Sequence, residues 1–434
     1  MRLPLAITGR LPLLLLAGVG PVVVRPGLDT VGWWTLLVLL AAGLDVALAA
    51  APDRLRFERD ATAPTRLGET TATHLRVEHG GRRRARGVLR DAWQPTAGAT
   101  GERHRLDLRP GDGVRLTTAL TPVRRGDLRA AGVTVRLRGP LGLAARQRTL
   151  PVEGRVRALP AFPSRVALPS RLARLRDLDG RAAVRVRGLG TEFDSLREYV
   201  PGDDVRSIDW RATGRSRRAV VRTWQPERDR RVVLVVDTSR TSAARVEDVP
   251  RLDAALDAAL FLAALATRAG DRVDLVAGDR RVRARARLGA ARDAVHRLDD
   301  LLAGLDPVLA EADWPTLAGA VADLGRNRAL LVLLTTLDAA PLEEGLLPLL
   351  PALTARHRVL LATVGEPELA RLAARTDTAG EVYAAAAAAQ AAARRSETAA
   401  LLRGLGVEVV DAAPDGLAVA LGDHYLALKA AGRL

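Results

Sequence analysis

The sequence contains no cysteine, and Lys429 is its only lysine. The absence of cysteine excludes disulfides, thiolate metal sites and cysteine nucleophiles. A phosphate-binding loop of the Gly-x-x-x-x-Gly-Lys type requires a glycine directly before its lysine, and Leu428 occupies that position here. We therefore expect that this chain is not itself an ATPase of that class.

Aromatic residues make up only 3% of the chain, although the net charge is +16 and the pI is about 11.3. Single-stranded nucleic acids are bound largely by stacking bases on aromatic side chains. The positive charge is almost entirely arginine, scattered along the chain, and no zinc-finger or RNA-recognition motif accompanies it. We expect no nucleic-acid partner.

Motifs of common enzyme classes are also missing. The six histidines have no His-Glu-x-x-His spacing, and no Gly-x-Ser-x-Gly sequence is present. Gly188 and Gly190 lack the third glycine of a dinucleotide-binding fingerprint. The sequence therefore predicts a protein that is not an enzyme and has no small-molecule substrate.

Two apolar stretches begin the chain. Residues 3–24 contain only Arg10 as a charge, and residues 30–51 contain only Asp45. Each is long enough to cross a bilayer, and Pro26 and Gly27 predict a turn between them. We expect a two-helix transmembrane hairpin over residues 1–52, rather than a cleaved signal peptide, because no small-x-small cleavage site follows the first stretch.

Arginines flank the hairpin unevenly. Arg54, Arg56 and Arg59 follow the second stretch, whereas Arg25 alone lies in the loop. The positive-inside rule then places the remaining chain in the cytoplasm. The prediction is a multi-pass protein of the cell membrane with two spans.

Residues 53–162 alternate apolar and polar side chains in short runs separated by glycine and proline. The run from Val133 to Arg138 is an example, and the turn at Gly139 and Pro140 follows it. This pattern is typical of half-buried strands joined by tight turns. It predicts a small antiparallel β-sandwich.

Residues 163–230 contain a proline-rich linker and a charged segment, and residues 231–434 alternate strands with helices. We expect strands over 231–236, 272–277, 282–288, 329–334, 359–364 and 407–410, with helices over 252–268, 290–304, 316–325, 342–355 and 384–402 and one more helix at the end. Such alternation predicts a doubly wound α/β domain with a mostly parallel sheet.

Polar side chains follow the first strand of that domain at Asp237, Ser239 and Thr241. Ligands of doubly wound sheets bind beyond the carboxyl ends of the strands. One carboxylate and two hydroxyls suit a hard cation such as Mg²⁺ or Mn²⁺. The alternative is a turn in which these side chains only satisfy free backbone N–H groups.

The charged segment before this domain contains interleaved arginines, carboxylates and aromatic residues over 190–210. We predict that it contacts a protein partner through Glu192, Arg197, Tyr199, Asp203, Asp204, Arg206, Asp209 and Trp210. The alternative is that the segment fastens onto the sheet, with its aromatic side chains buried and its charges paired at the rim.

Residues 190–210, which include Tyr199-Val200-Pro201-Gly202-Asp203-Asp204 and Ser207-Ile208-Asp209-Trp210, closely resemble the signature of domain-of-unknown-function family number 58. The order of elements and the Asp-x-Ser-x-Thr sequence also resemble a von Willebrand factor A domain with its metal-ion-dependent adhesion site. The resemblance implies that Thr316 and Asp338 join the metal ligands. The segment from Leu334 to Asp338 departs from the pattern, because a threonine two residues before Asp338 stands where the family usually has a ligand aspartate.

The resemblance further implies a function. Proteins of this family are typically associated with MoxR-type AAA+ ATPases, so the expected role is a membrane-anchored, non-catalytic adaptor or assembly protein that works with such an ATPase. An alternative function is a metal-dependent hydrolase, in which Asp203, Asp204 and Asp209 would converge with Asp237 on a metal that activates water.

Overall fold

The computed structural model describes residues 5–185, 192–201, 205–216, 218–225, 230–290, 293–325 and 327–434. The chain divides into two compact units, Met1–Pro160 and Ala161–Leu434. The expectation of a multidomain protein with an N-terminal apolar helix and several β-sheets is confirmed. Two of the charged residues predicted to contact a partner, Asp203 and Asp204, lie outside the described residues.

One long apolar helix lies near the N-terminus. Helix α3 (Leu28–Leu48) and the following 3-10 turn η1 (Pro52–Arg54) form a stretch with a mean hydropathy of 2.0, long and apolar enough to cross a membrane. The stretch before it divides into strand β1 (Leu5–Ile7) and helices α1 (Arg10–Leu16) and α2 (Val19–Val24). The predicted second span is therefore not supported.

The first apolar stretch is broken for local reasons. Its leading residues pair with strand β10 (Ala144–Leu150), which removes them from the helical part. The remaining helical part, Arg10–Val24, belongs to the shorter apolar helices of the described chain and falls below the roughly 20 residues that a bilayer requires. Pro21 also lacks a backbone N–H, which weakens the helix further.

Asp45 ties helix α3 to the sheet beside it. Its carboxylate is fully buried and accepts the backbone N–H groups of Leu141 and Leu143 at 2.7 Å and of Ala144 at 3.0 Å. A side chain at Gly139 would collide with Asp45, since a Cβ there would lie 2.2 Å from its Oδ1. The buried Asp45 carboxylate is thus satisfied by backbone N–H groups of a hairpin turn.

Two sheets follow in this unit, with two clusters of buried apolar side chains between them. The larger runs β1-β10-β9-β11-β3, with β5 paired to β9 and β7, and the smaller runs β2-β4-β8-β6. Their remaining strands are β2 (Leu55–Arg59), β3 (Thr65–Arg66), β4 (Thr71–His79), β5 (Ala85–Trp93), β6 (Ala99–Thr100), β7 (Arg103–Leu108), β8 (Gly113–Leu120), β9 (Gly126–Arg138) and β11 (Arg155–Leu159). Pairing is antiparallel except between β3 and β11. Alternate side chains of β4, β5 and β9 fill the core between the sheets.

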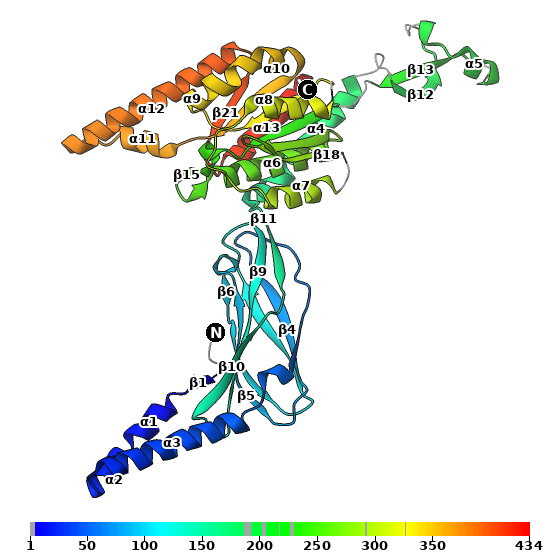
Figure 1. Cartoon of the computed structure of the whole chain (residues 1–434). Helices are drawn as coiled ribbons and strands as arrows, with labels where there is room; N and C mark the ends of the chain where they lie inside the picture. Colours follow the sequence, from blue (N-terminus) through cyan, green and yellow to red (C-terminus); the bar gives the residue numbers. More distant parts are fainter. Residues whose placement is uncertain are drawn as a thin grey trace. The chain divides into compact units, whose positions relative to one another are not determined.

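The second unit is built on a six-stranded sheet of order β18-β17-β14-β19-β20-β21 (Figure 1). Its strands are β14 (Arg231–Asp237), β17 (Arg272–Gly278), β18 (Val282–Gly289), β19 (Leu330–Leu334), β20 (Arg358–Val364) and β21 (Glu408–Ala412). Only the β17–β18 pair is antiparallel. Strand β14 lies in the middle and is buried along nearly its whole length, which explains its run of valine and leucine.

Helices cover both faces of this sheet (Figure 1). One face packs against α6 (Arg251–Arg268), α7 (Ala294–Ala303) and α13 (Leu417–Ala430), and the other against α8 (Trp314–Leu324), α10 (Leu350–Arg356) and α12 (Ala379–Gly404). Helices α6 and α13 approach closely at Gly422, where a Cβ would lie 2.4 Å from the Phe261 ring. Helix α12 begins earlier than predicted, because Thr378 and Glu381 form a capping box.

Several short elements complete the unit. They are η3 (Pro163–Ala167), α4 (Leu168–Arg185), β12 (Glu192–Glu198), η4 (Val205–Ser207), α5 (Trp210–Ser216), β13 (Val220–Gln225), η5 (Arg240–Ala243), β15 (Arg245–Val246), β16 (Val249–Pro250), α9 (Ala339–Pro341), η6 (Leu342–Leu346), η7 (Leu347–Leu349) and α11 (Pro367–Ala373). The predicted helix over 342–355 is divided because Pro348 and Pro351 interrupt it. Leu175, from the predicted linker, and Phe162, the last residue of the predicted sandwich, both pack into the main core of this unit.

Candidate functional site at the carboxyl edge of the sheet

Asp237 is the last residue of the central strand β14, and Thr335 directly follows the adjacent parallel strand β19. The 3-10 turn η5, which begins after Ser239, returns Thr241 toward the same strand end. Because parallel strands all end at one edge of the sheet, these side chains meet there. The sequence-based placement of Asp237, Ser239 and Thr241 on one loop agrees with this geometry.

The four side chains form a buried hydrogen-bonded cluster. Thr335 Oγ1 donates to Asp237 Oδ2 at 2.7 Å, Thr241 Oγ1 donates to the same oxygen at 3.3 Å, and the backbone N–H of Ser239 donates to Asp237 Oδ1 at 2.8 Å. The hydroxyls of Ser239 and Thr241 lie 3.0 Å apart. These side chains and the Ser239 N–H satisfy one another, although the Ser239 side chain itself does not cap η5.

Asp237 has no ion pair among the residues that the structure describes. Burial raises the pKa of its carboxyl above the ordinary value, and the hydrogen bonds from Thr335, Ser239 and Thr241 only partly oppose this. A buried carboxylate with neutral donors alone is an unfavourable anion. The cluster would therefore gain from a positive charge placed beside it.

The donor set fits a hard cation. All side-chain donors are oxygens, and Mg²⁺ with bonds of about 2.1 Å places neighbouring ligands about 3 Å apart. The 3.0 Å between Ser239 Oγ and Thr241 Oγ1 agrees with that spacing. Only one carboxylate contributes, because Thr335 supplies a hydroxyl where a second carboxylate would add charge, so the cluster offers a cation little electrostatic attraction.

The two other residues predicted as ligands make different contacts. Thr316 lies in the first turn of α8, where its hydroxyl and backbone N–H both donate to Asp313, at 2.8 and 3.0 Å. Asp338 accepts the Thr336 hydroxyl at 3.1 Å and lies 3.4 Å from Arg251. Helix capping and an ion pair, rather than contact with Asp237, account for these two side chains.

A chain of charged groups at the same edge was not predicted from the sequence. Arg251 contacts Glu366 as well as Asp338, and Arg395 lies 3.7 Å from Glu366 and 2.9 Å from Asp411. Glu366 follows strand β20 by two residues, so its position after a strand end was a readable signal. Arg251 and Arg395 come from helices α6 and α12, which no local pattern brings together.

The charged segment folds as its own small motif. Strands β12 and β13 pair antiparallel, and the η4 turn and helix α5 lie between them. Asp209 caps α5 by accepting the backbone N–H groups of Arg211 and Ala212, each at 3.0 Å. Glu192 forms a backbone pair in β12, Arg197 donates to the Glu198 carbonyl at 3.3 Å, and Arg206 lies exposed in η4.

Apolar side chains of this motif face solvent. Trp210 is 70% exposed, and Leu196, Val200 and Val205 are exposed as well. Tyr199 is half-buried and its backbone N–H donates to the Ala219 carbonyl at 2.8 Å. The expectation that the aromatic side chains of the segment would all be buried is wrong for Trp210, because α5 presents that side chain outward.

Comparison with known families gives a match over part of the chain. Residues 195–396 match the family described as protein of unknown function DUF58. The DUF58 match begins within β12 and ends within α12, so it includes the exposed motif and the Asp237 cluster. It supports the sequence-based resemblance over that range.

Relatives of this chain occur in mycobacteria. Uncharacterized proteins of Mycobacterium tuberculosis and Mycobacterium bovis are 28% identical over 184 residues, which cover 42% of this chain and 57% of each relative. The chain thus matches little more than half the length of these relatives. Their names state no activity.

Solved structures show weaker likenesses. A conserved hypothetical protein, BatB from Bacteroides thetaiotaomicron, has 14% identity and a TM-score of 0.28, covering 46% of this chain and 98% of that one. A PapD-like domain of human CEP192 has 15% identity and a TM-score of 0.17, covering 26% and 91%. Both TM-scores are below 0.5, so neither likeness defines the fold.

Proposed function

We propose that this protein is a membrane-anchored, non-catalytic adaptor that binds protein partners through a von Willebrand factor A-like C-terminal domain and works with a MoxR-type AAA+ ATPase. The observation that carries the proposal is the exposure of Trp210 on the β12–β13 motif. Tryptophan is among the residues most often responsible for binding energy at protein interfaces.

The exposed motif has the composition of an interface centre. Leu196, Val200 and Val205 of the same motif are exposed apolar side chains like Trp210, and charged side chains such as Arg206 and Glu198 are close by in sequence. A small apolar group within a charged surround is typical of protein-binding surfaces. A surface of this kind supports binding rather than catalysis.

Helix α3 is the proposed membrane anchor, with α1 and α2 packed along it through contacts such as Trp34 Nε1 to the Leu14 carbonyl at 3.1 Å. Exposed Arg54 and Arg56 follow the helix, which by the positive-inside rule favours a cytoplasmic location for the remaining chain. Asp45 would hold the anchor firmly to the sheets that follow.

The Asp237 cluster supplies a second proposed contact at the carboxyl edge. A bound Mg²⁺ or Mn²⁺ would supply a positive charge that accepts a carboxylate from a partner protein. Asp237, Ser239 and Thr241 would hold it, and the ion-paired groups around Arg251 and Glu366 would surround the contact. No described contact brings Asp209 to Asp237, so nothing observed favours the alternative hydrolase.

A direct binding measurement tests the adaptor. Full-length protein in detergent is immobilised, and a purified MoxR-type ATPase is passed over it with ATP present. We expect the Trp210→Ala variant to bind at least about tenfold more weakly, because an interface tryptophan commonly contributes about 2 kcal/mol or more.

Tyr383→Ala is the matched control, since Tyr383 is an aromatic side chain on α12 that is also largely exposed. That variant should bind as the unaltered protein does. Equal losses in both variants, or no binding of the ATPase by the unaltered protein, would contradict the proposal.

A further inference from the structure

A second candidate site lies at the opposite end of the six-stranded sheet, where the parallel strands begin. Arg358 and Glu408 are the first residues of β20 and β21, and Arg328 lies just before β19. The ends of α10 and α12 and the C-terminal helix α13 surround them, and together they line an open cavity of about 550 Å³. That volume lies in the range of small-molecule sites.

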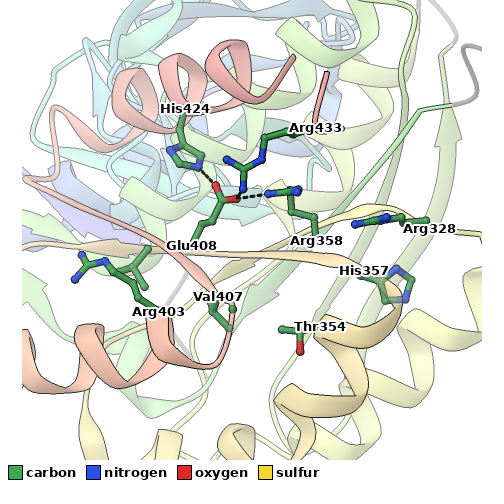
Figure 2. Close-up of a pocket in the computed structure, with 11 residues that line it drawn as sticks. Arg328, Thr354, His357, Arg358, Arg403, Val407, Glu408, His424 and Arg433 are labelled. Atoms are coloured by element: carbon green, nitrogen blue, oxygen red, sulfur yellow. Dashed lines mark hydrogen bonds and ion pairs between the residues drawn. The ribbon is translucent and has the colours of Figure 1, made fainter. Parts of the chain in front are cut away.

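The cavity has an excess of positive charge. Its lining includes four arginines, Arg328, Arg358, Arg403 and Arg433, against the single carboxylate of Glu408. Figure 2 shows Glu408 in the centre, with Arg358, Arg433 and His424 directed toward it. Arg358 donates to Glu408 at 2.5 Å, Arg433 lies 3.6 Å away, and His424 Nε2 contacts the other carboxylate oxygen.

Glu408 is an ionised internal counter-ion. Burial acts to raise the pKa of its carboxyl, but the bonds from His424 and Arg358 outweigh it, so the net effect is a lowered pKa. Its charge is therefore already shared between two guanidinium groups. Glu408 is therefore not a counter-ion for the other two arginines of the cavity.

Arg328 and Arg403 are these other two. Both are exposed, and neither side chain has a hydrogen-bond or ion-pair partner within the described part of the chain. In Figure 2 they stand on opposite sides of the Glu408 group. A ligand that satisfied both would need charged groups at more than one point.

Two buried atoms of the lining also lack partners among the described residues. They are Nε of Arg358 and Nδ1 of His357, whose side chain is only 8% exposed. Burial, with the nearby Arg231 and Arg356, lowers the pKa of His357 and so favours its neutral ring. The Nε–H of Arg358 is a buried donor, which is unfavourable unless an acceptor arrives.

We propose that this cavity binds a phosphate-bearing anion with at least two charged groups, of the pyrophosphate class. Arginine pairs bidentately with phosphate oxygens, and a phosphate group offers more charge and more acceptors than a carboxylate does. No phenylalanine, tyrosine or tryptophan among the described residues lines the cavity, and the His424 ring is engaged with Glu408, so recognition rests on charge.

Calorimetric titration of the full-length protein in detergent tests this with sodium pyrophosphate, ADP and citrate. Pyrophosphate should bind with saturable heat, and citrate at least tenfold more weakly. ADP binding comparable to pyrophosphate would assign the ligand to nucleotides, and markedly weaker ADP binding would assign it to free polyphosphates. Either result with ADP supports a phosphate site. The proposal is overturned if neither pyrophosphate nor ADP gives heat, or if citrate binds with the same affinity as pyrophosphate.

Variants locate the site. Arg328→Ala combined with Arg403→Ala should weaken pyrophosphate at least tenfold, and both positions are exposed, so the fold should persist. Arg297→Ala combined with Arg394→Ala removes the same charge from exposed positions on α7 and α12 and should change affinity less than twofold. Glu408→Gln should tighten binding. Equal weakening by the two double variants would mean non-specific charge attraction and would overturn the proposal.

Discussion

Two buried aspartates show how differently the two units of this protein treat a carboxylate. Asp91, in the N-terminal unit, forms a buried ion pair in which Arg59 donates through two nitrogens at 2.6 and 3.0 Å. Asp237, in the C-terminal unit, receives only hydroxyls and a backbone N–H. Both side chains are almost completely excluded from water.

Asp91 therefore has a structural role, whereas Asp237 is still available to bind a cation. Asp91 also accepts the Thr118 hydroxyl at 3.1 Å and the Trp93 indole at 3.3 Å, and Arg59 lies 5.0 Å above the Trp93 ring. Its charge is fully compensated within the sheets. Asp237 lacks a compensating cation among the described residues, and that missing charge is what makes its edge of the sheet a candidate for binding.

The largest expected effect concerns the compensated site. Arg59→Ala leaves Asp91 buried without its cation, which should cost the N-terminal unit about 3–5 kcal/mol of unfolding free energy. Urea unfolding followed by tryptophan fluorescence would measure it. Arg76→Ala is the control, because its pair with Glu58 is exposed and 3.9 Å long, and such pairs contribute below about 1 kcal/mol. Similar losses of unfolding free energy in the two variants would contradict the larger contribution expected of the buried pair.

A smaller effect is expected at the uncompensated site. Thr335→Asp places a second carboxylate beside Asp237 and should tighten Mg²⁺ binding at least tenfold, about 1.4 kcal/mol, because negative ligands attract the cation. Isothermal titration of the full-length protein with Mg²⁺ and Mn²⁺ gives the affinity, and Asp237→Ala should abolish the heat.

Thr336→Asp is the matched control for this variant, since the Thr336 hydroxyl contacts Asp338 rather than Asp237. It should leave the Mg²⁺ affinity unchanged. If Thr335→Asp and Thr336→Asp gave the same affinity as the unaltered chain, the cluster would not be a cation site.

The smallest effect concerns Asp271, which is intermediate between the two cases. Lys429 lies 3.2 Å from it and Tyr425 donates to it at 2.5 Å, yet burial outweighs both and raises the pKa of Asp271. A raised folded-state pKa gives a stability contribution that is present below the unfolded value near 4 and is lost as pH rises through the folded value.

Unfolding free energy of the C-terminal unit, measured from pH 4 upward, should therefore fall relative to Asp271→Asn, with a slope no steeper than about 1.4 kcal/mol per pH unit. The difference between the two proteins isolates this carboxyl from the others. A difference that grew with pH would mean that Lys429 outweighs burial.

Prediction from sequence succeeded where the pattern is local. The runs that became β14, β19 and β20 are continuous apolar stretches, and burial on both faces of a parallel sheet requires that composition. The Asp237 turn was also readable, because a strand end followed by Asp-x-Ser-x-Thr has few local alternatives. The first apolar stretch misled, since hydropathy does not reveal that Leu5–Ile7 pair with a distant strand.

The sequence by itself determined the apolar helix α3, the strand-rich first unit and the alternation of strands and helices in the second, because periodicity and turn residues act over a few positions. Only the tertiary structure decided which side chains meet: Thr335 with Asp237, Arg251 with Glu366, and Arg358 with Glu408. These pairs are far apart in the chain, and the packing of helices on the sheet, not any local pattern, sets their distances.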